Sequence, residues 1–271
     1  EKVQVSDIKF EGVPEMITIL GKDFDKKYLD KVKTLSLSPE AIQKEHDLKI
    51  VFTPLHGTTY ELVPASLRNW GFTNIHTVPE QSIPDGDFPT VASANPEEPA
   101  AFKMALDLAR KIDADLAMAC DPDGDRIGIA VKNDAGEWTL LNGNQTNIIF
   151  TEYIIRRKKE LNQLKGGEYT VKTIVTTELI KDIAEKNHII CYDVYTGFKW
   201  IADVIRKEGG EKFIGGGEES FGYMPGAFTR DKDGVSATSL MAEIAAWVKM
   251  QNKTLYSFLK EIYAKYGFSQ E

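Results

Sequence analysis

Residues 116–131 read LAMACDPDGDRIGIAV and set a charged six-residue loop between two apolar runs. The runs, Leu116 to Ala119 and Ile127 to Val131, predict two buried strands that meet at this loop. The loop repeats one residue type at alternate positions: Asp121, Asp123 and Asp125. Alternate side chains share a face of a strand, and in a tight turn three such carboxylates can converge on one point.

Three carboxylates packed together repel one another unless a cation neutralises them. Hard oxygen ligands of this kind select Mg²⁺ or Mn²⁺ and leave open positions for phosphate oxygens. Pro122 and Gly124 supply the bends, and the guanidinium of Arg126 can hold a phosphate through two hydrogen bonds. The loop therefore predicts a divalent metal site that faces a phosphate.

Three other interpretations of the loop compete with the metal site. A calcium EF-hand needs Gly at the sixth position and Glu at the twelfth, where this chain has Arg126 and Lys132, so it is excluded. A phosphohydrolase with an aspartyl nucleophile normally has Thr or Val soon after the second Asp, where this chain has Gly124 and Asp125; it is kept as an alternative. The third is an acidic turn that only faces solvent.

The composition narrows the class of partner. The chain has 271 residues, which fits two domains of ordinary size, and a net charge of −8, which argues against nucleic acid or an anionic membrane as its main partner. It has no apolar run of ~18 residues and no secretory leader. Cys120 and Cys191 border apolar runs and are expected to be buried, reduced thiols. These features predict a cytoplasmic protein.

The order of predicted elements favours two consecutive α/β domains. Residues 1–46 form a lead-in with one amphipathic helix, and residues 47–164 and 165–271 form the domains, divided near Gly166-Gly167. The strands are expected at 48–52, 75–78, 116–119, 127–131, 138–141, 171–176, 189–194 and 212–215. The helices are expected at 23–35, from the 53–58 turn to Trp70, 95–111, 144–161, 178–187, 198–208, 235–251 and 254–266, and Asn95 is expected to cap the third of them.

Three further motifs follow the acidic loop: 196–199 (TGFK), 217–222 (GEESFG) and 230–234 (RDKDG). Glu218 and Ser220 offer an acceptor and a donor for neighbouring sugar hydroxyls, and the glycines let a ligand approach the backbone. Each motif also has a plain structural interpretation: a flexible turn at 215–217, a solvated Lys199, and a surface ion-pair cluster around Lys232. A Walker phosphate loop is excluded because no Lys-Ser or Lys-Thr pair follows the glycines.

Taken together, these motifs resemble those of the α-D-phosphohexomutases, which include phosphoglucomutase and phosphomannomutase. Residues 121–126 match the metal loop D-x-D-[GA]-D-R of that family, and 217–222 match its sugar loop G-E-x-S-x-G. Residues 196–199 and 230–234 match T-G-[FWH]-K and R-x-K-D-G, in the order of the family. The segments 53–57 and 93–98 look most like the bacterial phosphoglucomutase branch.

The resemblance implies a fold of two α/β/α units with mixed sheets, the domains II and III of the family, preceded by a lead-in from a first domain. It implies an isomerase that moves phosphate between C1 and C6 of a hexose through a phosphoserine and a bisphosphorylated sugar. It also implies roles for individual residues. The metal ligands for Mg²⁺ are Asp121, Asp123 and Asp125; the catalytic residues are Lys232 and Arg126; the substrate-binding residues are Glu218, Ser220, Thr196, Gly197, Lys199 and Arg230.

The phosphoserine and a phosphate clamp are expected on first and fourth domains outside this chain. Ser93-Ala94-Asn95-Pro96 superficially resembles a phosphoserine loop, but a helix start explains it better, and His56 is expected to be a structural turn histidine. A sugar-phosphate-binding fragment without catalytic activity is the remaining alternative. The hydroxyl contacts of Glu218 and Ser220 do not separate glucose from mannose or pentose, and the motifs leave the oligomeric state open.

Overall fold

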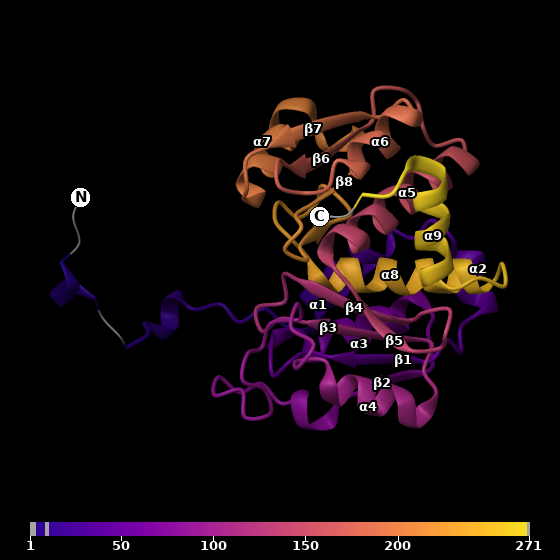
Figure 1. The fold of residues 1–271 in the computed structure, drawn as a ribbon. Coiled ribbons are helices and arrows are strands. Elements are labelled where there is room, and N and C mark those ends of the chain that lie inside the picture. The colour runs from indigo at the N-terminus through magenta and orange to yellow at the C-terminus, as the bar shows by residue number, and fades with distance from the viewer. Residues whose placement is uncertain (1–3, 9–10, 270–271) are drawn as a thin grey trace.

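The computed structural model describes residues 4–8 and 11–269. It contains two sheets with helices packed on them, placed one above the other in Figure 1. In that view the described residues before α1 extend away from both sheets as an arm. None of the helices in the described part of the chain is long and apolar enough to cross a membrane.

The first sheet is mixed and contains the acidic loop. Its strand order is β2 (Ile75–Thr77), β1 (Ile50–Thr53), β3 (Leu116–Cys120), β4 (Ile127–Lys132), β5 (Trp138–Leu141). β1 is parallel to both of its neighbours, whereas β3, β4 and β5 pair antiparallel. β3 is buried at every residue, as the apolar run predicts, so the loop that follows it starts from a fixed strand.

The second sheet is also mixed. Its strand order is β7 (Ile190–Val194), β6 (Tyr169–Thr173), β8 (Phe213–Gly217), β9 (Tyr223–Met224). β6 is parallel to β7 and β8, and β8 pairs antiparallel with β9, a short strand that the sequence pattern does not reveal. Two mixed α/β sheets are the fold class that the resemblance implies, and that prediction is confirmed.

The helices are α1 (Lys22–Lys33), α2 (Pro39–Lys44), α3 (Leu62–Trp70), α4 (Lys103–Ile112), α5 (Gly143–Glu160), α6 (Leu179–Lys186), α7 (Phe198–Glu208), α8 (Gly234–Lys249) and α9 (Leu255–Tyr266). Most helices lie close to their predicted positions; the exceptions are α2, which the sequence analysis does not predict, and the start of α4. Short 3-10 turns lie at Val5–Asp7, Pro14–Met16, Thr58–Tyr60, Pro79–Gln81 and Gly210–Lys212. α8 lies between the two sheets in Figure 1 and packs against α2, α3 and β3 on one side and β9 on the other. The division of the chain at 46/47 and 164/165 stays a prediction.

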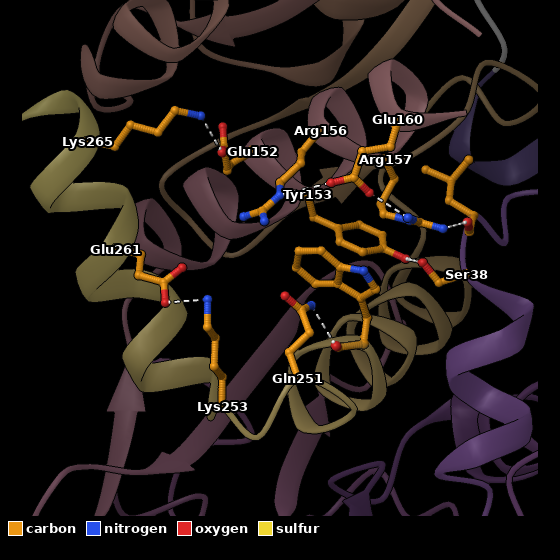
Figure 2. A network of polar contacts seen from close by, with 12 residues as sticks. Ser38, Glu152, Tyr153, Arg156, Arg157, Glu160, Gln251, Lys253, Glu261 and Lys265 are labelled. Carbon is orange, nitrogen blue, oxygen red and sulfur yellow. Dashed lines mark hydrogen bonds and ion pairs between the residues drawn. The ribbon is translucent and has the colours of Figure 1, made fainter. Parts of the chain in front are cut away.

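Polar contacts fasten α5 to its neighbours (Figure 2). The hydroxyl oxygens of Tyr153 and Ser38 lie 2.8 Å apart, a hydrogen bond that ties α5 to the lead-in. At the other side of α5, Lys265 Nζ lies 2.9 Å from an oxygen of the buried Glu152, which ties it to α9. Because the Tyr153 hydroxyl and the Glu152 carboxylate are buried and need hydrogen-bond partners, these contacts help to hold α5 against the lead-in and α9.

Two sequence predictions are wrong at this level. The helix expected from Asn95 begins at Lys103, because Pro99 would stand at its fourth position and could not donate the first helical hydrogen bond. Residues 95–102 instead form successive turns, in which Asn95 Oδ1 accepts from the backbone N–H of Glu97. Cys120 is buried, but Cys191 is only half-buried, because its strand β7 is at the edge of the second sheet.

Candidate functional site

The three aspartates of the acidic loop converge. One carboxylate oxygen from each of them can be chosen so that all three atoms lie within 4.8 Å of one another: Asp121, Asp123 and Asp125. Asp121 is buried, and its Oδ1 accepts the backbone N–H groups of Asp125 at 3.1 Å and Arg126 at 2.9 Å. The first aspartate therefore folds the loop back so that the third lies beside it.

The surrounding chain holds the loop tightly. The backbone N–H of Thr58 donates to Pro122 O at 2.8 Å, and the backbone N–H of Gly234, at the start of α8, donates to Gly124 O at 3.0 Å. A Cβ at Gly57 would lie 2.3 Å from Pro122 Cα, so only glycine fits there. The loop is thus clamped between the turn after β1 and the first residue of α8.

The electrostatics of the loop fit a bound cation. Burial raises the pKa of Asp121 to about 7; the backbone hydrogen bond from Arg126 opposes the rise, and the charges of Asp125 and Asp123 add to it. Neighbouring carboxyl groups oppose one another's ionisation, and a divalent cation between them stabilises their charged forms. The three oxygens are hard ligands on a bent loop, which is the donor set that Mg²⁺ or Mn²⁺ prefers.

The lysine of the 230–234 segment reaches the loop. Lys232 Nζ lies 2.9 Å from Asp125 Oδ2 and 3.2 Å from Asp231 Oδ1, and it sits 5.0 Å from the centre of the Phe198 ring. Burial lowers the pKa of Lys232, but the hydrogen bonds and charges of Asp125 and Asp231 outweigh burial and raise it overall. The ammonium is therefore charged and is directed at the acidic loop by its ion pair.

Arg126 lies over the same group of acids. Its Nε is 3.7 Å from Asp121 Oδ2 and 3.9 Å from Asp125 Oδ1, and its NH1 donates to Glu97 Oε1 at 3.2 Å. The sequence predicts Glu97 in the first turn of a helix, so its contact with Arg126 is not evident from the pattern. The guanidinium is partly exposed beside the carboxylates, where it can meet a phosphate.

The glycine-rich loop joins the acidic loop through the backbone. The backbone N–H of Ile127 donates to Phe221 O at 3.0 Å, and Arg126 and Gly222 form an antiparallel bridge. Glu218 is buried, and its Oε1 accepts the backbone N–H of Gly197 at 2.5 Å. Three separate sequence motifs therefore meet at one place, next to the aspartates.

Other predicted site residues are less engaged. Lys199 is exposed, with its Nζ 5.4 Å from the centre of the Trp200 ring, and Thr196 is exposed as well. Arg230 is exposed and donates through Nε to Ala227 O at 3.3 Å, while Ser220 is half-buried. Within the described residues, no hydrogen bond or ion pair joins the side chain of Thr196, Lys199 or Arg230 to the three aspartates.

Asp233 supports the site as a helix cap, a role that the sequence analysis does not assign to it. Its Oδ1 accepts the backbone N–H groups of Val235 and Ser236 at 3.1 and 3.2 Å, so it caps α8. The same oxygen accepts the hydroxyl of Tyr28 at 2.7 Å. The Asp-Gly pair before an apolar helix could have revealed the cap, but nothing local reveals the contact with α1.

His56 behaves as the sequence predicts. It is buried, with Nδ1 3.0 Å from Ile83 O and Nε2 2.8 Å from Thr90 Oγ1. Both ring nitrogens are occupied by the segment that follows β2, so this histidine holds a turn.

Comparison with known proteins identifies the class to which this fold and site belong. Residues 26–136 match the family described as phosphoglucomutase/phosphomannomutase, alpha/beta/alpha domain II, and residues 142–266 match its alpha/beta/alpha domain III. The chain therefore belongs to the α-D-phosphohexomutase superfamily and carries its domains II and III.

Individual relatives agree with that class. A phosphoglucomutase of Staphylococcus aureus (strain MRSA252) is 39% identical over 222 residues, which are 82% of this chain and 40% of that protein. A solved protein from Thermus thermophilus, assigned as a phosphomannomutase, has a TM-score of 0.73 at 22% identity over 91% of this chain and 52% of its own. Paramecium parafusin, a phosphoglucomutase solved in its open form, has a TM-score of 0.66 at 19% identity, over 91% of this chain and 42% of its own.

At such identities the two solved structures show the fold alone. This chain spans 40% of the length of the S. aureus relative. The family match confirms the superfamily that the sequence motifs resemble. The S. aureus relative confirms the similarity of this chain to bacterial phosphoglucomutase.

Proposed function

We propose that this chain is the metal- and sugar-binding core of a phosphohexomutase that interconverts hexose 1-phosphate and hexose 6-phosphate, with glucose or mannose as the sugar. The observation that carries the proposal is the meeting of the acidic loop, Lys232 and the 217–222 loop at one site. Membership of the family supports the reaction class, and the meeting of the three segments supports this site as the place of the reaction.

The three aspartates are the proposed ligands of Mg²⁺. The bound ion would withdraw electron density from the transferring phosphate. Arg126 lies beside the same carboxylates and is proposed to bind a phosphate oxygen, which places positive charge where negative charge accumulates during transfer.

Lys232 is the proposed acid and base for the hydroxyl that gains or loses the phosphate. Its ammonium Nζ lies 2.9 Å from Asp125 Oδ2, at the edge of the metal loop, so it can give a proton to the oxygen that loses the phosphate. The amine so formed can take a proton from the hydroxyl that gains the phosphate. Phe198 shields one side of the ammonium, which limits its access to water.

Glu218 and Ser220 are the proposed contacts for sugar hydroxyls. The backbone N–H of Gly197 occupies Glu218 Oε1, which leaves Oε2 to accept a hydroxyl. Thr196, Lys199 and Arg230 are proposed to complete the substrate site; their exposed side chains can turn toward a phosphate at the far end of the sugar. A phosphoserine and a further phosphate clamp are proposed to come from other parts of a longer parent protein.

A coupled assay from glucose 1-phosphate tests this function. With Mg²⁺ and glucose 1,6-bisphosphate present, we expect turnover by the proposed longer parent protein and none by the 271-residue chain alone, because the proposed phosphoserine lies outside it. Turnover by the isolated chain would place the nucleophile within it, at Ser93 or elsewhere. Phosphate release from generic phosphoesters without mutase activity would favour an aspartyl phosphohydrolase instead.

A further inference from the structure

Glu219 lies between the two proposed sugar-binding residues in the sequence, but its side chain is bound to a different part of the domain. Its Oε2 accepts the hydroxyl of Thr176 at 3.1 Å and that of Thr173 at 3.3 Å. Both threonines are buried, and their hydroxyl oxygens lie 2.8 Å apart. Buried hydroxyls lose their water partners on folding, so a shared carboxylate oxygen gives this contact a definite geometry.

Thr173 ends β6 and Thr176 lies in the turn that follows it, and this turn is itself fixed. Lys172 is 0% exposed, and its Nζ donates to Thr176 O at 3.1 Å. The same ammonium pairs with Glu178 Oε1 at 2.7 Å and Asp193 Oδ1 at 2.8 Å. A buried charge needs such partners, so the turn after β6 is held in one position relative to the end of β7. The hydroxyls that bind Glu219 therefore belong to a rigid part of the chain.

A second contact fixes the backbone of the same loop from the side of α5. Asn147 is buried, and its Nδ2 donates to Glu218 O at 2.7 Å and to Gly143 O at 2.9 Å. A Cβ at Gly143 would lie 1.8 Å from Glu219 O, so the first turn of α5 touches the loop backbone directly. The loop at 218–219 is thus held through its main chain by α5, and through the Glu219 side chain by the last residue of β6 and the turn after it.

We propose that Glu219, together with Thr173 and Thr176, is a positioning residue for the sugar site. The inference rests on the proposed function and adds a residue to it, because Glu219 occupies the unspecified position of the motif G-E-x-S-x-G. Its anchored carboxylate keeps the backbone on either side in place, so that Glu218 and Ser220 face the hydroxyls of a hexose phosphate without prior reordering. A glycine-flanked loop without that anchor must be ordered by the ligand, and this ordering weakens binding.

The experiment uses four variants of the 271-residue chain: Glu219→Ala, Glu219→Gln, Thr176→Val and Thr176→Ser. Glucose 6-phosphate is titrated into each and followed by NMR. We expect about tenfold weaker binding for Glu219→Ala and Thr176→Val, as for the loss of a buried hydrogen-bonded anchor. Glu219→Gln keeps an acceptor oxygen and Thr176→Ser keeps the hydroxyl, so both variants should bind within about twofold of the wild-type affinity.

Amide exchange at 218–222 is the second readout, with Glu211→Ala as the control, since Glu211 is an exposed glutamate of the same domain. Faster exchange in Glu219→Ala at 218–222, but not in β6, supports the proposal. Wild-type affinity in Glu219→Ala overturns it, even if exchange is faster, because the residue would then only stabilise the fold.

Failure of the proposed function gives a different result. In that case the wild-type chain does not bind glucose 6-phosphate at all, and amide exchange alone decides whether Glu219 holds the loop. Unchanged exchange in Glu219→Ala would then contradict the positioning role.

Discussion

Lys232 Nζ lies 2.9 Å from Asp125 Oδ2, which joins the segment before α8 to the loop after β3. The two residues are far apart in the sequence, and each belongs to a motif that the family comparison places in a different domain. Their contact therefore brings the proposed proton carrier to the proposed metal ligand. The backbone N–H of Gly234 also donates to Gly124 O, so a main-chain hydrogen bond joins the two segments in addition to this ion pair.

Metal binding should depend on the middle aspartate of the loop. We expect the chain to bind Mn²⁺ or Mg²⁺ weakly, and Asp123→Asn to weaken it further, because one charged ligand becomes neutral. Calorimetric titration compares the wild type with this variant and with the variant in which all three aspartates are asparagine. Equal affinity in the wild type and the triple variant would rule out a metal site here.

Lys232 and Glu218 should affect different kinetic constants in the proposed longer parent protein. Lys232→Met is expected to lower kcat, because it removes proton transfer in the transition state, whereas Glu218→Ala should mainly raise KM by removing sugar contacts made throughout. Steady-state kinetics of both variants in the coupled assay separates the two roles. A change in KM alone for Lys232→Met would show that the lysine binds substrate and does not transfer a proton.

The turn after β1 should support the metal loop. A methyl group at Gly57 would lie 2.3 Å from Pro122 Cα, so Gly57→Ala must displace the loop backbone. We expect a loss of about 1–3 kcal/mol in the free energy of unfolding, the usual cost of overpacking, together with weaker Mn²⁺ binding. Gly86→Ala is the matched control, because a Cβ there meets no atom within 4 Å. If both variants unfold alike, the turn does not clamp the loop.

Glu243 should make stability depend on pH. Its carboxylate is buried and accepts from the backbone N–H of Leu37 at 2.8 Å and from the Tyr153 hydroxyl at 2.7 Å. Burial raises its pKa above the ordinary value of 4.5, and the hydrogen bonds from Ser36, Leu37 and Tyr153 only partly oppose the rise.

A raised carboxyl pKa stabilises the fold below pH 4.5, and that stabilisation is lost as the pH rises through the folded-state pKa. Relative to the wild type, Glu243→Gln should therefore gain in free energy of unfolding as the pH rises from about 4 to 8, because its amide does not ionise. Urea unfolding of both proteins at several pH values measures this difference. A constant difference across that range would contradict the raised pKa.

The sequence predicts those parts of the site that depend on local pattern. The strands on either side of the acidic loop follow from their apolar runs, and the end of α3 follows from Gly71, which has a φ of +124°. The convergence of the three aspartates follows from their alternate spacing. These features need only neighbours in the chain.

The remaining parts depend on contacts between distant segments. Tyr28 and Asp233 are 205 positions apart, and Thr173 and Glu219 are 46 apart, so no periodic pattern connects them. A capping pattern predicts a helix that includes Glu97, but Pro99 prevents that helix from starting there. The side chains that hold the proposed catalytic residues in place are therefore visible only in the folded chain.

The most direct test of the account measures metal and sugar phosphate in one site. With Mn²⁺ bound to the chain, the ³¹P relaxation rate of glucose 1-phosphate should rise steeply, because the phosphate is proposed to lie close to a paramagnetic ion held by Asp121, Asp123 and Asp125. Glu218→Ala should reduce the effect by weakening sugar binding, and Asp123→Asn should reduce it by weakening metal binding. A relaxation rate that is the same for the wild type and the triple asparagine variant would contradict the account.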